Sequence, residues 1–321
     1  MVKAVFFFAV GLILLIKGGD WFVDGSVRIS HRLRVPEILI GATVVSIGTT
    51  LPEVMVSATS AISGHGQIAY GNAIGSIICN TSLIAAVTIA IKPSDTDRKA
   101  LKLPVIFFFC AAVFYVATAY IFGFFSRLSG IILLAVFLVY MILSVRSARQ
   151  TVISDTESEN AEVKGSILLD VFWLIIGAAL IAVGADLLVD NGTVIAKSLG
   201  VPESVIGLTI VALGTSLPEL VTAITALTKG HGALSLGNVI GANLFNLVLV
   251  SGLSTTLSPF AVPIEKTISG IPASFIIDIP VMLGVMLILT LPALIKGKLY
   301  RSQGILLLLI YAAFCIFQFA V

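Results

Sequence analysis

Two carboxylates lie in the middle of long apolar segments, where a charge is costly. Glu53 closes the sequence GTTLPE (48–53), and Glu219 closes the sequence GTSLPE (214–219). A carboxylate near the centre of a bilayer costs about 2.5–3.5 kcal/mol. Two such residues in matching motifs indicate a bound cation or proton; two separately hydrogen-bonded structural acids are the alternative interpretation.

Each hexapeptide also carries oxygen atoms that suit a hard cation. Its proline removes one backbone N–H and disturbs the carbonyl four residues earlier, and its glycine permits local unwinding. The freed carbonyls around residues 46–49 and 212–215 are ligands of the kind that Na+ and Ca2+ accept. The neighbouring hydroxyls belong to Thr49, Thr50, Thr215 and Ser216.

A polar helix face follows the first hexapeptide. Ser76 and Asn80 are four residues apart, so they share one face of an otherwise apolar helix. We expect this face to border the same cavity as the glutamates. Asn246 is the equivalent residue in the second half of the chain, but its partner position, Ala242, has no side-chain oxygen.

The ligand types favour a hard ion. Carboxylate, hydroxyl, amide and carbonyl oxygens suit Na+, Ca2+ or Mg2+, and no paired cysteine or histidine accompanies them. Cys79, Cys110 and Cys315 occur singly, which indicates neither a disulfide framework nor a metal motif. We therefore expect transported ions and no cofactor.

The other polar residues of these segments receive structural interpretations. Asn72 and Asn238 are expected to cap or pack, and His65 and His231 to occupy turns rather than to sense pH. Asp278 is either a second intramembrane site or a bonded structural acid. Four aspartates are interpreted as solvated helix ends in preference to cation attractors, namely Asp20, Asp24, Asp186 and Asp190.

The composition of the chain is that of a membrane protein, so we expect these residues to be positioned by transmembrane helices. Of 321 residues, 58% are hydrophobic and 11% are charged, with a mean hydropathy of +1.11, whereas soluble domains carry about 25% charged residues. A net charge of +2 does not indicate a surface that binds nucleic acid.

A membrane-spanning helix needs about 20 apolar residues. With this length we predict an all-α polytopic protein with ten transmembrane helices. The first of them is expected to be a retained helix rather than a signal peptide. They are expected near 4–27, 37–62, 68–91, 103–122, 128–145, 167–190, 203–228, 234–257, 270–294 and 303–320.

The chain consists of two related halves. A polar stretch at 146–164 is predicted to be a cytoplasmic linker between membrane regions 1–145 and 165–321. An ungapped offset of 166 residues superimposes 36–80 on 202–246 with 20 of 45 pairs identical, which indicates an internal duplication. Five helices per copy force the second copy to insert upside down, as in secondary transporters that bind their cargo between the copies.

The basic residues predict the orientation. If the linker is cytoplasmic, 14 of the 19 lysines and arginines lie on that side, four lie on the other, and Lys17 is ambiguous. Cytoplasmic loops carry the excess of basic residues. We therefore expect both termini to lie outside the cell membrane.

The paired motifs GTTLPE and GTSLPE, each followed by a GNxxG helix, resemble the alpha-repeats of the sodium/calcium exchanger family. This family is a branch of the cation/calcium exchanger superfamily. The short linker between the two halves resembles that of the prokaryotic members. The resemblance covers essentially the whole chain. It implies a ten-helix inverted-repeat antiporter in which ions bind between helices 2, 3, 7 and 8 while helices 1 and 6 slide across them. The ion ligands that it implies are Glu53, Glu219, Thr49, Thr50, Thr215, Ser216, the carbonyls of Ser46 and Ala212, Ser76, Asn80 and Asn246.

Three positions depart from the family pattern. Well-studied members carry a serine at the position of Ala242, an aspartate at that of Asn246 and an asparagine at that of Ile77, which Asn243 keeps in the other half. The resemblance therefore leaves the number and identity of the counter-ions open.

These observations predict a non-enzymatic antiporter in the cytoplasmic membrane that exchanges Ca2+ for Na+. The alternatives are a proton-coupled or potassium-dependent exchanger, a passive cation channel, and an intramembrane enzyme with an acid dyad. The expected partners are the two ions and the lipid bilayer, with no nucleic acid and no obligate protein partner.

Overall fold

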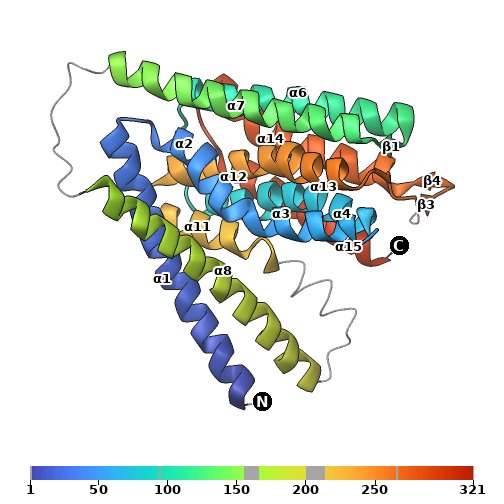
Figure 1. Ribbon diagram of the computed structural model, residues 1–321, viewed down its shortest axis with the longest axis horizontal. Helices are drawn as coiled ribbons and strands as arrows, with labels where there is room; N and C mark the ends of the chain where they lie inside the picture. The colour runs from blue at the N-terminus through green and yellow to red at the C-terminus, as the bar shows by residue number, and fades with distance from the viewer. Residues whose placement is uncertain (1, 94, 155–165, 200–213, 265–266, 321) are drawn as a thin grey trace.

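The computed structural model describes residues 2–93, 95–154, 166–199, 214–264 and 267–320, and this part of the chain is almost entirely helical (Figure 1). The first half contains α1 (Val2–Leu33), α2 (Glu37–Ile40), η1 (Gly41–Val45), α3 (Ser46–Ile62), α4 (Gly66–Cys79), η2 (Asn80–Ala85), α5 (Ala86–Ile91), α6 (Arg98–Phe122) and α7 (Arg127–Ser154). The second half contains α8 (Ile167–Ser198), α11 (Leu217–Thr228), α12 (Gly232–Phe245), η4 (Asn246–Val250), α13 (Ser251–Leu257), η5 (Ser274–Asp278), α14 (Ile279–Lys296) and α15 (Arg301–Ala320). The η segments are single π-helical turns inside longer helices.

Nine helices in the described residues are long and apolar enough to cross a membrane. The tenth predicted span, 203–228, is represented by the shorter apolar helix α11, and residues 200–213 lie outside the described part of the chain. Four two-residue strands pair as β1 (Phe124–Phe125) with β2 (Phe260–Ala261) and β3 (Thr267–Ile268) with β4 (Ile271–Pro272), both antiparallel. The prediction of an all-α polytopic membrane protein is confirmed.

Two helices are longer than their apolar segments. α1 continues to Leu33 through the polar residues that made its predicted end uncertain. α7 continues to Ser154, so the first part of the predicted linker 146–164 is helical. Residues 146, 148, 149 and 150 are arginine, alanine, arginine and glutamine, which are good helix formers and favour this continuation of the helix.

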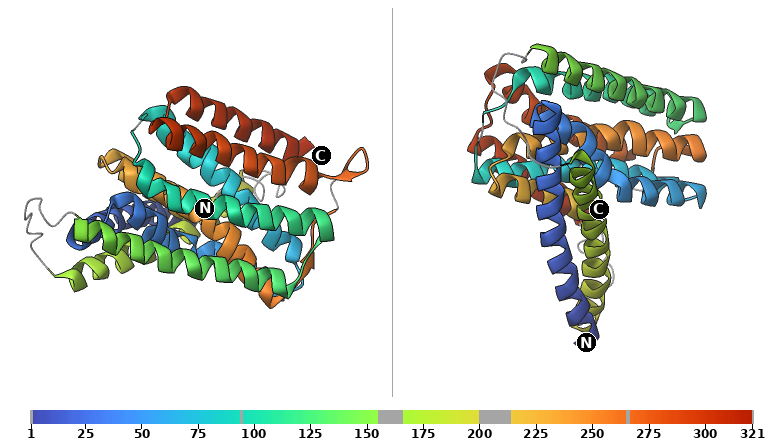
Figure 2. Two further views of the ribbon diagram at one scale, coloured as in Figure 1. Left: turned by 90° about the horizontal axis from the view of Figure 1, so that it is seen from above. Right: turned by 60° about the vertical axis from the view of Figure 1, so that its left-hand side comes forward.

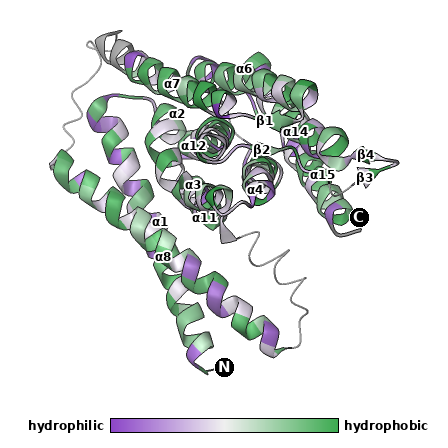
Figure 3. Cartoon of the chain, turned by 45° about the vertical axis from the view of Figure 1, so that its right-hand side comes forward, coloured by the Kyte–Doolittle hydropathy of each residue, from purple (hydrophilic) through white to green (hydrophobic). Residues whose placement is uncertain are grey.

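α1 and α8 pack along each other and project from the bundle (Figures 1 and 2). Their backbones approach closely where glycines face one another. A Cβ atom on Gly18 would lie 2.9 Å from the carbonyl oxygen of Gly177, and one on Gly11 would lie 2.9 Å from that of Gly184. Small residues allow this close packing between helices in a bilayer. Both helices are hydrophobic overall, with hydrophilic residues at intervals along them (Figure 3).

The central bundle is formed by the two repeats together. α12 packs against α2, η1 and α3, while α4 packs against α3 and η4. The side of α12 that carries Gly237 and Gly241 lies directly on the backbone of Ile38 and Ala42. α6, α7, α14 and α15 flank this bundle, and large apolar side chains such as Tyr115, Phe108 and Phe245 fill the space between them.

Candidate metal-ion site

The carboxylates of the two intramembrane glutamates are fully buried. Glu53 lies in α3 and Glu219 in the first turn of α11, each with 0% exposure. No described residue donates a hydrogen bond to any of their four carboxylate oxygens. The two side chains lie within electrostatic reach of each other. The buried carboxylate pair is therefore left without a hydrogen-bond donor in the part of the chain that the structure describes.

Buried neutral groups around the central helices are unsatisfied as well. The hydroxyl of Thr50 and both side-chain amide atoms of Asn80 and Asn246 have no partner among the described residues. More than about 90% of buried polar groups in proteins are hydrogen-bonded. Such a concentration of orphaned oxygen atoms fits a bound ion, whose chemistry these hard ligands suit.

The asparagines occupy matching irregularities of the two repeats. Asn80 begins the π-turn η2 and Asn246 begins the π-turn η4, with nearly the same backbone angles, φ −57° and ψ −41° against φ −57° and ψ −40°. π-turns inside α-helices are frequent at functional sites. η2 contacts α11, the helix of Glu219, and η4 contacts α3, the helix of Glu53. Each asparagine segment thus lies against the glutamate helix of the other repeat.

The two prolines act differently in the two halves. Pro218 lies in the first turn of α11, and the residues before it, Thr215 and Ser216, form a turn, so the predicted unwinding occurs there. Pro52 lies inside α3, which remains helical from Ser46 to Ile62, so the predicted unwinding of the first hexapeptide is wrong. A proline in the first turn loses no helix hydrogen bond, whereas packing against neighbouring helices keeps α3 intact around Pro52.

Thr49 and Ser46 join α3 to α12. The Thr49 hydroxyl donates to the side-chain oxygen of Asn238 at 3.2 Å. The Ser46 hydroxyl lies 2.7 Å from the carbonyl oxygen of Gly41 and 3.0 Å from that of Asn238. Thr49 also lies beside Glu219. Ala212, the counterpart of Ser46, lies outside the described residues.

Asn238 is a residue of this site that the sequence interpretation missed. Its side-chain oxygen accepts from Thr49, and its Nδ2 is buried without a partner in the described residues. The equivalent Asn72 has a packing role, because its Nδ2 donates to the Glu53 carbonyl at 3.2 Å and to the Ser57 hydroxyl at 2.8 Å. Both repeats carry asparagine at this position, and this identity was the feature of the sequence that could have pointed to Asn238.

Ser76 and Ser216 are both buried close to this region. Ser76 is 4% exposed and lies one turn before Asn80, while Ser216 lies beside Cys79 of the same helix α4. Thr215 is half-buried. The structure thus brings α4 of the first repeat next to the turn that precedes α11 of the second.

The remaining polar residues are held by other contacts. His65 and His231 precede α4 and α12 in equivalent turns, as expected, and His231 Nδ1 lies 2.9 Å from Glu37 Oε1. Asp278 accepts a hydrogen bond from Gln318 at 2.9 Å, which favours the structural interpretation.

The interpretation of Asp20 and Asp24 as helix ends is wrong. They lie within α1 and form ion pairs with Lys229 at 3.1 and 2.8 Å. Asp186 and Asp190 likewise lie within α8 rather than at its end.

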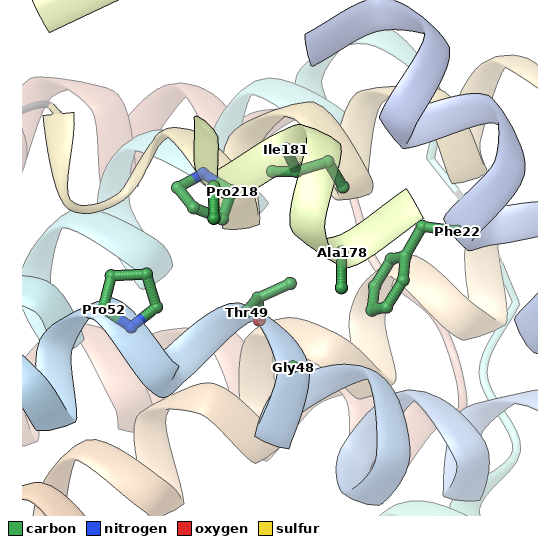
Figure 4. A pocket seen from close by; sticks show the side chains of 8 residues that line it. Phe22, Gly48, Thr49, Pro52, Ala178, Ile181 and Pro218 are labelled. Carbon is green, nitrogen blue, oxygen red and sulfur yellow. The ribbon is translucent and has the colours of Figure 1, made fainter. Parts of the chain in front are cut away.

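A small cleft lies between the two hexapeptides and the α1–α8 pair (Figure 4). It is lined by Thr49 and Pro52 of α3, by Pro218 of α11 and by apolar residues of the two long helices, including Phe22 and Ile181. The prolines of both hexapeptides therefore border the surface on which α1 and α8 lie.

The sequence matches the family model described as "sodium/calcium exchanger protein" over residues 3–146 and 169–320. The chain belongs to the sodium/calcium exchanger family. The sodium/calcium exchanger MaX1 of Methanosarcina acetivorans is 32% identical over 96% of this chain and 96% of its own length. The inner membrane protein YrbG of Escherichia coli is 35% identical over 81% of each chain.

The fold of this exchanger-family chain is that of a solved relative. A structure of the sodium-calcium exchanger NCX_Mj soaked with Na+ and Sr2+ superimposes with a TM-score of 0.82 and 32% sequence identity, covering 100% of this chain and 98% of that chain. The family is one of transporters rather than enzymes.

Proposed function

We propose that this chain is an antiporter that exchanges Ca2+ for Na+ across the cytoplasmic membrane. Glu53 and Glu219 bind both ions in turn, assisted by oxygen atoms of the two hexapeptides and by the amides of Asn80 and Asn246. The observation that carries the proposal is the burial of both carboxylates with all four oxygens unpartnered in the described structure. Family membership and the named exchangers among its relatives support it.

Exchange follows from competition for one pair of charges. Ca2+ and Na+ need the same two carboxylates, so the binding of one ion weakens the binding of the other. An empty site carries two buried charges without compensation, and buried unpaired charge is strongly penalised. Reorientation is therefore restricted to loaded states, which couples the outward movement of one ion to the inward movement of the other.

The α1–α8 pair is the moving element in this proposal. These helices contact each other far more extensively than they contact the bundle, and the cleft beside the hexapeptide prolines lies under them. Their sliding across the bundle exposes the site alternately to the two sides, as the resemblance to the family implies.

Radiolabelled Ca2+ uptake into proteoliposomes tests the proposal. An imposed Na+ gradient drives uptake by the wild-type protein, and Glu53→Gln or Glu219→Gln reduces the rate at least about a hundredfold, because each removes a charge from a buried pair. Glu37→Gln is the matched control, since Glu37 begins the same apolar segment but contacts His231 at its end, and it retains uptake.

The same assay distinguishes the alternatives. Uptake driven by a pH gradient without Na+ assigns the chain to proton-coupled exchange, and an absolute requirement for K+ assigns it to potassium-dependent exchange. Flux without any counter-ion identifies a channel. Full activity of both glutamine variants contradicts the proposed site.

A further inference from the structure

A groove lined mainly by apolar side chains lies between the last two helices of the chain. α14 and α15 are placed away from the α1–α8 pair (Figure 3), and the groove between them has a volume of about 480 Å3. Leu291, Ile295 and Leu306 line it and are 51%, 61% and 47% exposed. The described residues therefore leave a large apolar surface uncovered inside a concave site.

A proline and a glutamine hold the two helices together at this groove. Pro292 has no N–H group, so the carbonyl of Ile288, four residues earlier, loses its partner within α14. Gln303 of α15 donates to this carbonyl at 2.6 Å and to the carbonyl of Leu289 at 3.0 Å. Gln303 is itself buried and lines the groove. The groove is therefore part of how α14 and α15 pack together.

The polar residues of the groove gather at one end of it. Lys296, Tyr300 and Ser302 line the groove where α14 ends and α15 begins. The Nζ atom of Lys296 lies over the Tyr300 ring, 5.5 Å from the ring centre. Tyrosine and lysine at the end of a membrane-spanning helix lie at the level of the lipid headgroups. The groove thus joins apolar walls within the membrane to a polar end at its surface.

The charge at this end of the groove is positive. The charged side chains between residues 279 and 321 are Lys296, Lys298 and Arg301, all of them basic. Lys298 lies 3.6 Å from Asp95, and Arg301 donates to a backbone carbonyl of α5. No described acid pairs with Lys296, which is the basic residue that lines the groove. The charge of Lys296 is therefore available to an anionic ligand.

We propose that this groove binds an anionic phospholipid, with an acyl chain against the apolar walls and the phosphate of the headgroup at Lys296. Basic pockets between transmembrane helices suit acidic headgroups. A second copy of the chain fits less well, because a symmetric pair brings the same surface of each copy together and with it the three basic residues of each. The lipid site is separate from the candidate ion site and does not depend on the proposed exchange.

Tryptophan fluorescence in lipid vesicles tests the site. Leu309 lies one turn beyond Leu306 on the same face of α15 and does not line the groove. Leu309→Trp therefore reports on a bound acyl chain without filling the groove. The native tryptophans are removed by Trp21→Phe and Trp173→Phe.

Ile106→Trp, in the same background, is the matched control. Ile106 and Leu309 are both exposed, and each lies eight residues after the arginine that begins its helix, Arg98 or Arg301. The two helix starts lie at the same end of the bundle, because a Cβ atom on Gly297 would be 2.7 Å from Arg98 Nε. Ile106 does not line the groove. The control therefore measures general attraction of acidic lipid to a basic surface.

The vesicles contain unlabelled phosphatidylcholine and an increasing fraction of phosphatidylglycerol or phosphatidylcholine whose chains carry bromine, which quenches nearby tryptophan. In the Leu309→Trp protein we expect half-maximal quenching at a mole fraction about fivefold lower for phosphatidylglycerol, the effect of one lysine on an acidic headgroup. In the Ile106→Trp protein the two lipids should differ less than about twofold. Equal preferences at the two positions, or no quenching of the Leu309→Trp protein by either lipid, overturn the inference.

Two further substitutions separate the groove from the charge of its surroundings. Lys296→Gln in the Leu309→Trp protein should abolish the preference for phosphatidylglycerol. Lys298→Gln removes the same charge from a residue that does not line the groove, and it should retain the preference. A preference that survives Lys296→Gln, or one that both substitutions abolish, contradicts the proposed site.

Native mass spectrometry of the wild-type protein gives a test that needs no substitution. Protein equilibrated with equal amounts of the two lipids should retain phosphatidylglycerol in preference to phosphatidylcholine. Equal retention overturns the inference, including the case in which the tryptophan variants do not fold.

Discussion

Thr49 is one of the residues through which the two repeats meet at the candidate site. It belongs to the first hexapeptide, yet its hydroxyl donates to Asn238 of the second repeat and its side chain lies beside Glu219. The hydroxyl therefore fixes the orientation of the Asn238 amide. A neutral hydrogen bond of this kind contributes about 0.5–1.5 kcal/mol.

Removal of this hydroxyl should weaken cation binding. Thr49→Ala leaves the Asn238 side-chain oxygen with only the longer contact from the Ser46 hydroxyl, at 3.4 Å. We expect the half-saturating Ca2+ concentration to rise about threefold to thirtyfold, since about 1.4 kcal/mol corresponds to a factor of ten. The measurement is initial Ca2+ uptake against Ca2+ concentration. Thr49→Ser keeps the hydroxyl and should retain the wild-type value; equal losses in both variants would mean that the threonine methyl group, and not the hydrogen bond, is responsible.

Lys229 joins the helix α1 to the central bundle. It follows α11 and bonds to Asp20 and Asp24 of α1. Burial lowers the pKa of Lys229, but the hydrogen bonds to Asp24 and Asp20 outweigh this effect and raise the pKa above its ordinary value of 10.5. The equivalent position in the first repeat is Ser63, so this link has no counterpart of the same charge on the opposite side.

Loss of the link should loosen α1 without unfolding the protein. In Lys229→Gln we expect faster hydrogen exchange in α1 around Asp20 and Asp24, with a change in the free energy of unfolding below about 1 kcal/mol because the pair is partly exposed. Lys229→Arg keeps the charge and serves as the control. Unchanged exchange in the glutamine variant would show that packing against the neighbouring helices, and not this ion pair, holds α1 in place.

The pH dependence of the link follows from the same pairing. A raised lysine pKa means that its contribution to stability is complete below the ordinary value of 10.5 and is lost only as pH rises through the raised value. The link to α1 therefore persists throughout the neutral range and is weakened only in strong alkali.

The whole molecule carries an asymmetry of charge across the membrane. Because cytoplasmic loops carry the excess of basic residues, and this excess lies on the side of residues 146–164, we propose that this side faces the cytoplasm. A membrane-impermeant thiol reagent applied to intact cells should therefore label Val2→Cys and leave Ser158→Cys unlabelled until the cells are opened. Both variants are made with the three native cysteines replaced by alanine, and the reverse pattern of labelling would invert the proposed orientation.

The linear chain was sufficient to predict most helices of this protein. Apolar segments separated by short polar turns specify membrane spans because every backbone group must be bonded within the bilayer. The offset of 166 residues identified the repeats, and the cost of burying Glu53 and Glu219 identified them as candidate ligands. Each of these inferences depends on a local pattern or on the chemistry of a single side chain.

Only the tertiary structure decided which groups lie together and where the helices are irregular. The π-turns at Asn80 and Asn246, the bond from Thr49 to Asn238 and the pairing of Lys229 with α1 join residues that are far apart in sequence or depend on packing between helices. The intact helix around Pro52 arises in the same way, because its neighbours in the bundle compensate for a break that the local sequence favours. Contacts of this kind are determined by how complete helices fit together, which residue spacing along one segment does not encode.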